Sequence, residues 1–428
     1  MAILLISVFS LTLLLGVPVA FCLGFTGLIG LFHSGVVSLL VVPQRMFTGI
    51  DIFPLMAIPL FILAGSLMEA GGITKRLVNF SNLLVGHLKG GLAHTNIVAS
   101  MFMAGISGAG VADAAAIGSL LIPAMKDEGY DDDFSAAVVA AASVSGPIIP
   151  PSITMVVYAS TVGVSVGGLF LSGFIPGLML CLGLMLVVYI MAGRRSYVWS
   201  TRRARLPEIL RGSADALPAL IMPVIIMGGI LSGIFTATEA AAVAVFYAFV
   251  VGLFVFREIK PPHLKKIIIS SGVTTAVILF IIACANILAW VLSSQQVPQR
   301  LSEFLLSVGT NPFLVLFVVN IFLLVIGMFL ETGAAVILLA PILHPALVAI
   351  GLDPLHVGLV FVLNLSIGLI TPPVGVCLFV TCAIAKISIE TLSKAILPFL
   401  LVELVTLFLA SFFPQLVMFI PRYLGYGG

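Results

Sequence analysis

The chain has 428 residues, of which 61% are hydrophobic and only 8% are charged, and its formal net charge is +2. Soluble domains carry about a quarter charged residues, and no polar stretch here is long enough to build one. The composition therefore predicts a polytopic protein embedded in a lipid bilayer, and it excludes a nucleic-acid-binding module, which would need a basic face.

The apolar runs of the first half, residues 1–193, are bounded by charged residues and by Gly and Pro clusters. The opening segment lacks a basic flank, so we expect a retained span and not a cleaved signal peptide. Two of the segments are too short to cross a bilayer twice, and together they predict a re-entrant hairpin. The predicted elements are spans at 2–22, 24–42 and 52–70, an amphipathic arm at 72–90, hairpin segments at 91–105 and 113–126, a segment at 133–163 broken at SGPIIPPS, and a span at 168–192.

A basic connector, residues 194–213, leads to a second half, residues 214–428, with the same order of segments. The predicted elements are spans at 215–233, 236–256 and 267–293, a polar arm at 294–311, hairpin segments at 312–328 and 334–350, a broken segment at 355–385, and a span at 390–412. Gly and Pro positions of the two halves coincide without a gap: Gly105 matches Gly327, and Pro150-Pro151 matches Pro372-Pro373, each 222 positions later. The repeat therefore concerns backbone geometry as well as hydropathy.

The orientation follows from Lys and Arg in short loops, which favour the cytoplasmic side. The connector is the strongest such signal, and Arg45 is the one clear exception to the resulting topology. Each half then has five crossings, so the second half is predicted to be inverted relative to the first, with both termini outside. The connector arginines are Arg194, Arg195, Arg202, Arg203, Arg205 and Arg211.

Each half is interrupted at two places, the hairpin tip and the Pro-Pro break. Irregular backbone at membrane depth is tolerated only where protein buries it or where it lines a wet cavity. A broken helix leaves unpaired carbonyls that, with Ser and Thr hydroxyls, can coordinate Na⁺, so we expect at least two Na⁺ ions, one per half. The alternative is that these small residues only allow close helix packing. The predicted ligands are Ser107, Gly108, Gly110, Ser145, Gly146 and Pro147 in the first half, and Thr332, Gly333, Gly368 and Thr371 in the second.

Acidic residues in apolar surroundings are costly and are functional candidates. Asp113 follows the first tip and Glu331 lies at the second, although Asp113 could also be a helix cap. Glu239 is more typical of a structural contact, and Glu403, in the last span, is expected to face either a partner or an internal polar contact. The breaks contain no Lys or Arg, so a substrate carboxylate is expected to meet helix N–H groups and hydroxyls. The predicted substrate residues are Ser152, Thr154, Asp113, Glu331, Asn364 and Thr371.

Two rival classes fit less well. The tetrapeptide GISG at 105–108 matches the GxSG motif of rhomboid intramembrane proteases, but no histidine lies at an obvious partner position. A passive channel would line a pore with polar residues, whereas polarity here is confined to four interruptions. No nucleotide-binding loop is present, so an ion gradient is the expected driving force.

Three segments identify a family resemblance: residues 228–257, which contain GIFTATEAAA, SGAGVADAAAIGSLLIPAMKDEGY at 107–130, and SGPIIPPSITMVVYAS at 145–160. They closely resemble the large membrane subunit of tripartite ATP-independent periplasmic (TRAP) transporters, and the resemblance covers essentially the whole chain. The family tip more often contains SGSA, so the tip at 107–110 would lack one side-chain ligand but keep its carbonyls.

The resemblance implies an all-α inverted repeat with two re-entrant hairpins and two broken helices, divided into a scaffold and a mobile elevator domain. It implies a Na⁺-coupled secondary transporter of the bacterial inner membrane, and not an enzyme. The implied partners are a small four-helix membrane subunit and a soluble periplasmic binding protein that delivers an organic acid, such as sialic acid or a C4-dicarboxylate. The alternative is a self-sufficient Na⁺/carboxylate symporter of related fold.

Overall fold

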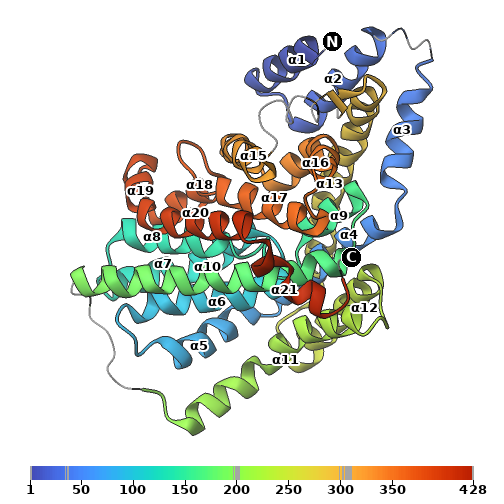
Figure 1. Cartoon of the computed structure of the whole chain (residues 1–428). Coiled ribbons are helices and arrows are strands. Elements are labelled where there is room, and N and C mark those ends of the chain that lie inside the picture. The colour runs from blue at the N-terminus through green and yellow to red at the C-terminus, as the bar shows by residue number, and fades with distance from the viewer. Residues whose placement is uncertain are drawn as a thin grey trace.

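The computed structural model describes residues 2–426, except for 34, 36–37, 196, 198–202, 298, 301–302 and 304–310. Within those residues every regular element is a helix (Figure 1). The first half forms α1 (Ala2–Leu14), α2 (Val19–His33), α3 (Val41–Ile50), η1 (Phe53–Met56), α4 (Ala57–Ala70), α5 (Ile73–Val85), α6 (Gly91–Ser107), α7 (Gly110–Asp127), α8 (Asp132–Ser143), α9 (Ile153–Val162) and α10 (Val166–Arg195).

The second half forms α11 (Leu206–Leu231), α12 (Ala237–Val250) with a π-helical turn η2 (Val251–Val255), α13 (Pro261–Ser294), α15 (Pro312–Gly327), α16 (Thr332–Ala349), α17 (Pro354–Gly368), α18 (Val376–Ala385), α19 (Ile389–Ala395), α20 (Leu397–Phe412) and α21 (Pro414–Tyr423). The predicted arm at 294–311 falls mostly outside the described residues, so its helical character stays a prediction.

The repeat predicted from Gly and Pro is present in the helix bounds. Helix α7 spans 110–127 and α16 spans 332–349, so both ends of the return arm shift by 222 positions, and α8 and α17 begin at 132 and 354, the same distance apart. Each half therefore has a helical hairpin followed by a broken helix. Both Pro-Pro peptide bonds at the breaks are cis.

Six helical segments among the described residues are long and apolar enough to cross a membrane, or up to eight if the bent pairs α18–α19 and α20–α21 each count as one. Helix α16 passes this length test, although its repeat position makes it one arm of a hairpin.

Two predicted bounds were wrong at the N-terminus. The span 2–22 ends at Leu14 because Gly16 has φ +77° and Pro18 follows it, and 41–50 forms a separate helix, α3.

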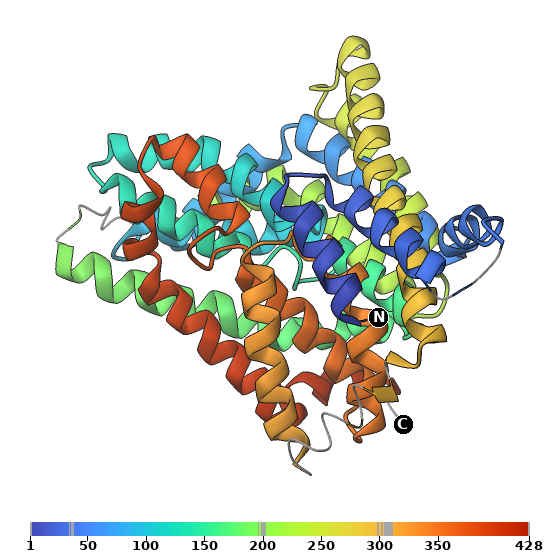
Figure 2. The same cartoon turned by 90° about the horizontal axis from the view of Figure 1, so that it is seen from above.

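The helices form two groups. Helix α13 packs against α2, α3 and α4, while α11 and α12 pack on each other and on α5 and α4. The hairpins and broken helices form the other group, together with α10 and α20 (Figures 1 and 2). We call the first group the scaffold and the second the hairpin body.

The partly buried Arg76 side chain connects the arm helix α5 to the scaffold. The Arg76 guanidinium lies 2.7 Å from a carboxylate oxygen of Glu258 and 3.5 Å from one of Asp215, and it stacks 3.9 Å from the centre of the Phe256 ring. Arg76 also donates to the carbonyl oxygen of Gly72 at the start of α5. These contacts join α5 to α11 and to the turn before α13, while α5 also packs along α6 of the hairpin body, so the arm lies between the two groups.

Candidate functional site

The first hairpin tip packs directly against the first break. A Cβ atom on Gly108 would lie 2.7 Å from the Pro151 carbonyl oxygen and 2.9 Å from the Ile153 amide nitrogen, and Gly108 itself has φ +62°. A Cβ on Gly110 would lie 2.8 Å from the Ser143 carbonyl oxygen. Only glycine allows this approach of the two backbones. The structure thus brings the predicted residues of the first half together.

Asp113 lies at the centre of this contact. Its side chain is 1% exposed, and its Oδ1 accepts a 2.5 Å hydrogen bond from the Ser107 hydroxyl. Its Oδ2 has no hydrogen-bond partner among the described residues and faces Gly146, whose Cβ would lie 2.6 Å from it. The helix-cap alternative for Asp113 was wrong, because the N-cap of α7 is Ala109. A buried carboxylate oxygen without a partner, beside irregular backbone, can accept a cation.

The second tip meets the second break through different residues. A Cβ on Gly368 would lie 2.5–2.7 Å from the backbone atoms of Gly327, and the Gly375 amide donates to the Met328 carbonyl oxygen at 3.1 Å. The Thr332 hydroxyl is 3.5 Å from the Leu365 carbonyl oxygen. The described contacts therefore place the close approach at Gly327 and Gly368, before the predicted tip residue Gly333.

The predicted substrate residues differ in their hydrogen bonds and in their burial. Ser152 caps α9 by accepting from the Met155 amide, and it donates to the Pro147 carbonyl oxygen across the break at 2.6 Å. The Thr371 hydroxyl donates to the Ile367 carbonyl oxygen. Glu331 is exposed and caps α16 by accepting from the Ala334 amide. Thr154 is buried in the first turn of α9.

Asn364 belongs to a buried polar chain that sequence analysis did not find. Its side-chain amide donates to the Asn320 carbonyl oxygen at 3.0 Å and to the Asn320 side-chain oxygen at 2.9 Å, and Asn320 donates to the Ser411 hydroxyl. The chain connects α17 with α15 and α20. The two asparagines in largely apolar helices were the only available signal, and they are 44 positions apart in sequence.

The two halves are interlocked. A Cβ on Gly110 would touch Leu369 in the second break, and one on Gly118 of α7 would lie 3.2 Å from Ile384 of α18. In the reciprocal contact, the Tyr158 hydroxyl on α9 lies 2.7 Å from His344 Nδ1 on α16. Each hairpin therefore packs on the broken helix of the other half, and both tips belong to one body.

The two remaining acidic candidates, Glu239 and Glu403, have different surroundings. Glu239 forms a reciprocal capping box with Thr236 at the start of α12, which confirms a structural contact. Glu403 on α20 is fully buried, and neither of its carboxylate oxygens has a partner among the described residues. No cluster of three or more His, Cys, Asp or Glu side chains suited to a metal ion occurs in the described part of the chain.

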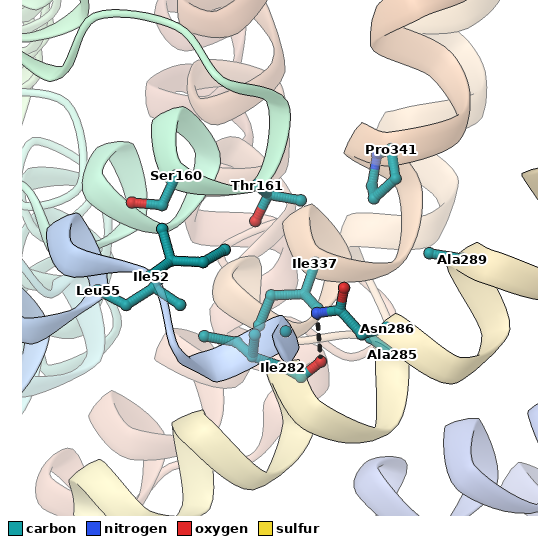
Figure 3. Close-up of a pocket in the computed structure, with 11 residues that line it drawn as sticks. Ile52, Leu55, Ser160, Thr161, Ile282, Ala285, Asn286, Ala289, Ile337 and Pro341 are labelled. Carbon is teal, nitrogen blue, oxygen red and sulfur yellow. Dashed lines mark hydrogen bonds between the residues drawn. The ribbon is translucent and has the colours of Figure 1, made fainter. Parts of the chain in front are cut away.

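A cavity of about 130 Å³ lies where the scaffold meets the hairpin body (Figure 3). The scaffold contributes residues from the end of α3, η1 and α13, and the hairpin body contributes the last turn of α9 and the middle of α16. Ser160, Thr161 and Asn286 provide its polar side chains, and the rest of the lining is apolar. The sequence contains no local pattern that joins these five elements.

The chain is similar to known transport proteins over most of its length. Residues 5–416 match the family model described as tripartite ATP-independent periplasmic transporter, DctM component. The chain is 40% identical to the sialic acid TRAP transporter large permease protein SiaM of Vibrio cholerae, covering 96% of each chain. It is 43% identical to the C4-dicarboxylate TRAP transporter large permease protein DctM of Pseudomonas aeruginosa, covering 89% of each.

A solved transporter shares the fold at much lower identity. The YdaH transporter of Alcanivorax borkumensis matches with a TM-score of 0.66 at 15% identity, covering 91% of this chain and 90% of its own. The relatives are inner-membrane permeases, and several helices here are long enough to cross a bilayer, so the protein is a multi-pass protein of the bacterial inner membrane. Together with the family match over nearly its whole length, this shows that the chain belongs to the DctM component family, the large permease subunits of TRAP transporters.

Proposed function

We propose that this permease imports an organic acid, of the sialic acid or C4-dicarboxylate type for which its relatives are named, by coupling uptake to at least two Na⁺ ions. The observation that supports this most is the Asp113 carboxylate, which is buried between tip and break with one oxygen unpartnered. A monovalent cation there would neutralise the charge and accept ligands from the loop carbonyls.

We place the first Na⁺ between Ser107 and Asp113 on one side and the break at 145–147 on the other. The second would lie between the tip at Thr332 and the break at 368–371. The substrate carboxylate would meet the N–H groups at the start of α9, near Ser152 and Thr154, and the hydroxyl of Thr371. The interlocked hairpin body would carry these sites past the scaffold as an elevator, while the Arg76 contacts hold the arm α5 in place.

Transport in this proposal also requires two partners, a small four-helix membrane subunit and a soluble periplasmic binding protein. The test is uptake into proteoliposomes that contain this chain and its small membrane subunit, under an inward Na⁺ gradient. We expect uptake only when the cognate binding protein is present outside. Robust uptake of free substrate without it would instead support a self-sufficient Na⁺/carboxylate symporter, and uptake that ignores the Na⁺ gradient would overturn the coupling.

A further inference from the structure

The hairpin body contains two buried carboxyl groups whose surroundings differ. Asp113 and Glu403 are the only Asp or Glu side chains among the described residues that are buried. Asp113 lies at the first tip, where the Ser107 hydroxyl donates to one of its oxygens and the backbone of the break lies close. Glu403 lies in the middle of α20, is fully buried, and has no hydrogen-bond partner for either oxygen in the part of the chain that the structure describes. A buried polar group without partners requires an explanation.

The helices around Glu403 supply no counter-charge. Helix α20 packs on α8, α10, α15, α17, α19 and α21, all of which the structure describes (Figure 1). The acidic side chains of these six helices lie in first turns and are not buried: Asp132, Asp133 and Glu390. Their Lys and Arg side chains are exposed and lie in last turns: Arg194, Arg195, Lys394 and Arg422. A carboxylate ion at Glu403 would lack both hydration and a positive partner, which is strongly unfavourable.

The buried titratable groups around Glu403 are two thiols and one imidazole. A charge on Glu403 would act on the thiols of Cys181 on α10 and Cys377 on α18, both of which are buried. His356 on α17 donates through Nε2 to the Ala410 carbonyl oxygen at 2.8 Å, and Ala410 is about 10 Å along α20 from Glu403. Thiols carry no positive charge and the imidazole is engaged elsewhere, so none of the three balances a carboxylate.

A proton fits this position better than a metal cation does. Sodium ions in membrane proteins are coordinated by carbonyls of unwound backbone, but Glu403 lies inside the continuous helix α20, whose carbonyls bond within the helix. The Thr406 hydroxyl on the same helix donates to the Val402 carbonyl oxygen. A protonated carboxyl group needs no counter-charge and has one O–H to donate. The surroundings of Glu403 therefore favour the neutral acid.

The burial of Glu403 does not depend on the position of the scaffold. The helices packed on α20 belong to the hairpin body, and α21 continues from α20, so movement of this body past the scaffold leaves their contacts closed. The first tip differs, because a Cβ on Gly65 of scaffold helix α4 would lie 3.6 Å from the Ser107 Cα. The Asp113 site thus lies at the boundary between the two groups, where an ion can exchange, whereas the Glu403 site lies within one of them.

We propose that Glu403 is a proton-binding site that is occupied at neutral pH and keeps its proton throughout the transport cycle, while the cation at Asp113 exchanges. The retention during transport rests on the proposed transport function, whereas the occupancy of the site does not. The proton is then a fixed part of the hairpin body and not a coupling ion, so a pH gradient does not drive uptake.

The first test is infrared difference spectroscopy of the purified complex of this chain and its small membrane subunit, at neutral pH in saturating Na⁺. The carbonyl stretch of a protonated carboxyl group is separate from the bands of ionised carboxylates, and ¹³C labelling of glutamate shifts it only if a glutamate carries the proton. We expect this band in the wild type and its loss in Glu403→Gln and Glu403→Leu. Glu390→Gln is the matched control and should keep the band, because it removes an exposed carboxylate from the neighbouring helix α19.

The second test is the pH dependence of denaturant unfolding of the same complexes. In the unfolded chain a glutamate is ionised at neutral pH, because its ordinary pKa is about 4.3. Unfolding therefore releases the Glu403 proton, and each pH unit of increase raises the unfolding equilibrium constant about tenfold through this group. Glu403→Gln keeps the shape and cannot ionise. We expect its unfolding constant, relative to the wild type, to fall about a hundredfold from pH 6 to pH 8, whereas Glu390→Gln should follow the wild type.

Four results would overturn the inference: no glutamate acid band in the wild type, a band that persists in both Glu403 variants, equal pH dependence of unfolding in the wild type and Glu403→Gln, or uptake driven by a pH gradient alone. Na⁺-driven uptake of substrate delivered by the binding protein is measured in the same preparations and should persist in both folded variants; its loss in both would show that the proton takes part in transport. If the wild type lacks Na⁺-driven uptake but shows the band, the proposed function fails and the proton site stands.

Discussion

The contact between Gly368 and Gly327 offers a graded test of the second tip–break junction. In Gly368→Ala the new Cβ would lie 2.5 Å from the Gly327 carbonyl carbon, whereas ordinary contacts begin at 3.4 Å, so the two backbones must separate by about 0.9 Å. Both partners are backbone atoms and cannot rotate away. Overpacking of this kind costs about 1–3 kcal/mol, which is about a fivefold to a 150-fold loss in Na⁺ affinity if the ion needs the closed junction.

Two further variants complete the series. In Gly327→Ala the nearest atom is the Gly368 Cα at 3.2 Å, so a shift of a few tenths of an ångström suffices and a smaller loss is expected. Gly272→Ala on α13 meets nothing within 4 Å and should be neutral or slightly stabilising, because alanine favours helices.

The assay is the Na⁺-dependent rise in unfolding temperature of each purified variant, with uptake measured in parallel. The unfolding temperature without Na⁺ separates general instability from weaker ion binding. We expect the Na⁺ affinity to fall in the order Gly272→Ala, Gly327→Ala, Gly368→Ala. Equal Na⁺ affinity in Gly368→Ala and Gly272→Ala would show that close approach of tip and break is not needed for ion binding.

The other predictions concern the first junction, its carboxylate and the topology. Gly108→Ala should abolish Na⁺-dependent uptake because its Cβ meets backbone at 2.7 Å, whereas Gly333→Ala meets only the movable Glu331 carboxylate and should keep most uptake; similar uptake in both would argue against the packing account. Asp113→Asn should lower Na⁺ affinity at least tenfold, because the neutral amide no longer supplies the negative charge that balances a buried cation. The rise in unfolding temperature with Na⁺ concentration measures this affinity, and an unchanged affinity would contradict the prediction. Cysteines placed in the connector at 194–211 should be labelled only from the cytoplasm and cysteines at the C-terminus only from the periplasm; labelling of both from one side would exclude the inverted repeat.

Much of the hairpin body was predictable because its breaks are encoded locally. Clusters of Gly and Pro within an apolar segment interrupt helices, so the tip at 107–110 and the break at Pro150-Pro151 were located from sequence. The acidic residues show the limit of such reasoning. Glu331 was correctly placed at a tip, but its side chain caps its own helix and is exposed.

What could not be predicted depends on contacts between distant segments. Tyr158 and His344 are 186 positions apart, and neither lies in a pattern that points to the other. The cavity is lined by Asn286 of the scaffold and by Ser160 of the hairpin body, and their proximity is a property of how the two groups pack. Helix α3 was missed because most of it lies beyond the predicted span 24–42 and contains Pro43, Gln44 and Arg45, so a search for apolar runs left these residues as a connection.

The interlocking of the two halves also constrains how the protein is made. Helix α7 reaches its final packing only when α18 is present, because Gly118 lies against Ile384. During synthesis the first hairpin therefore cannot reach its final packing until more than 250 further residues have been added (113 to 384). Until then Asp113 lacks its final surroundings. The first half expressed alone should fold less completely than it does in the whole chain, and co-expressed halves should protect each other from proteolysis. The same contacts that join the two tips into one body thus make the last third of the chain a requirement for the maturation of the first.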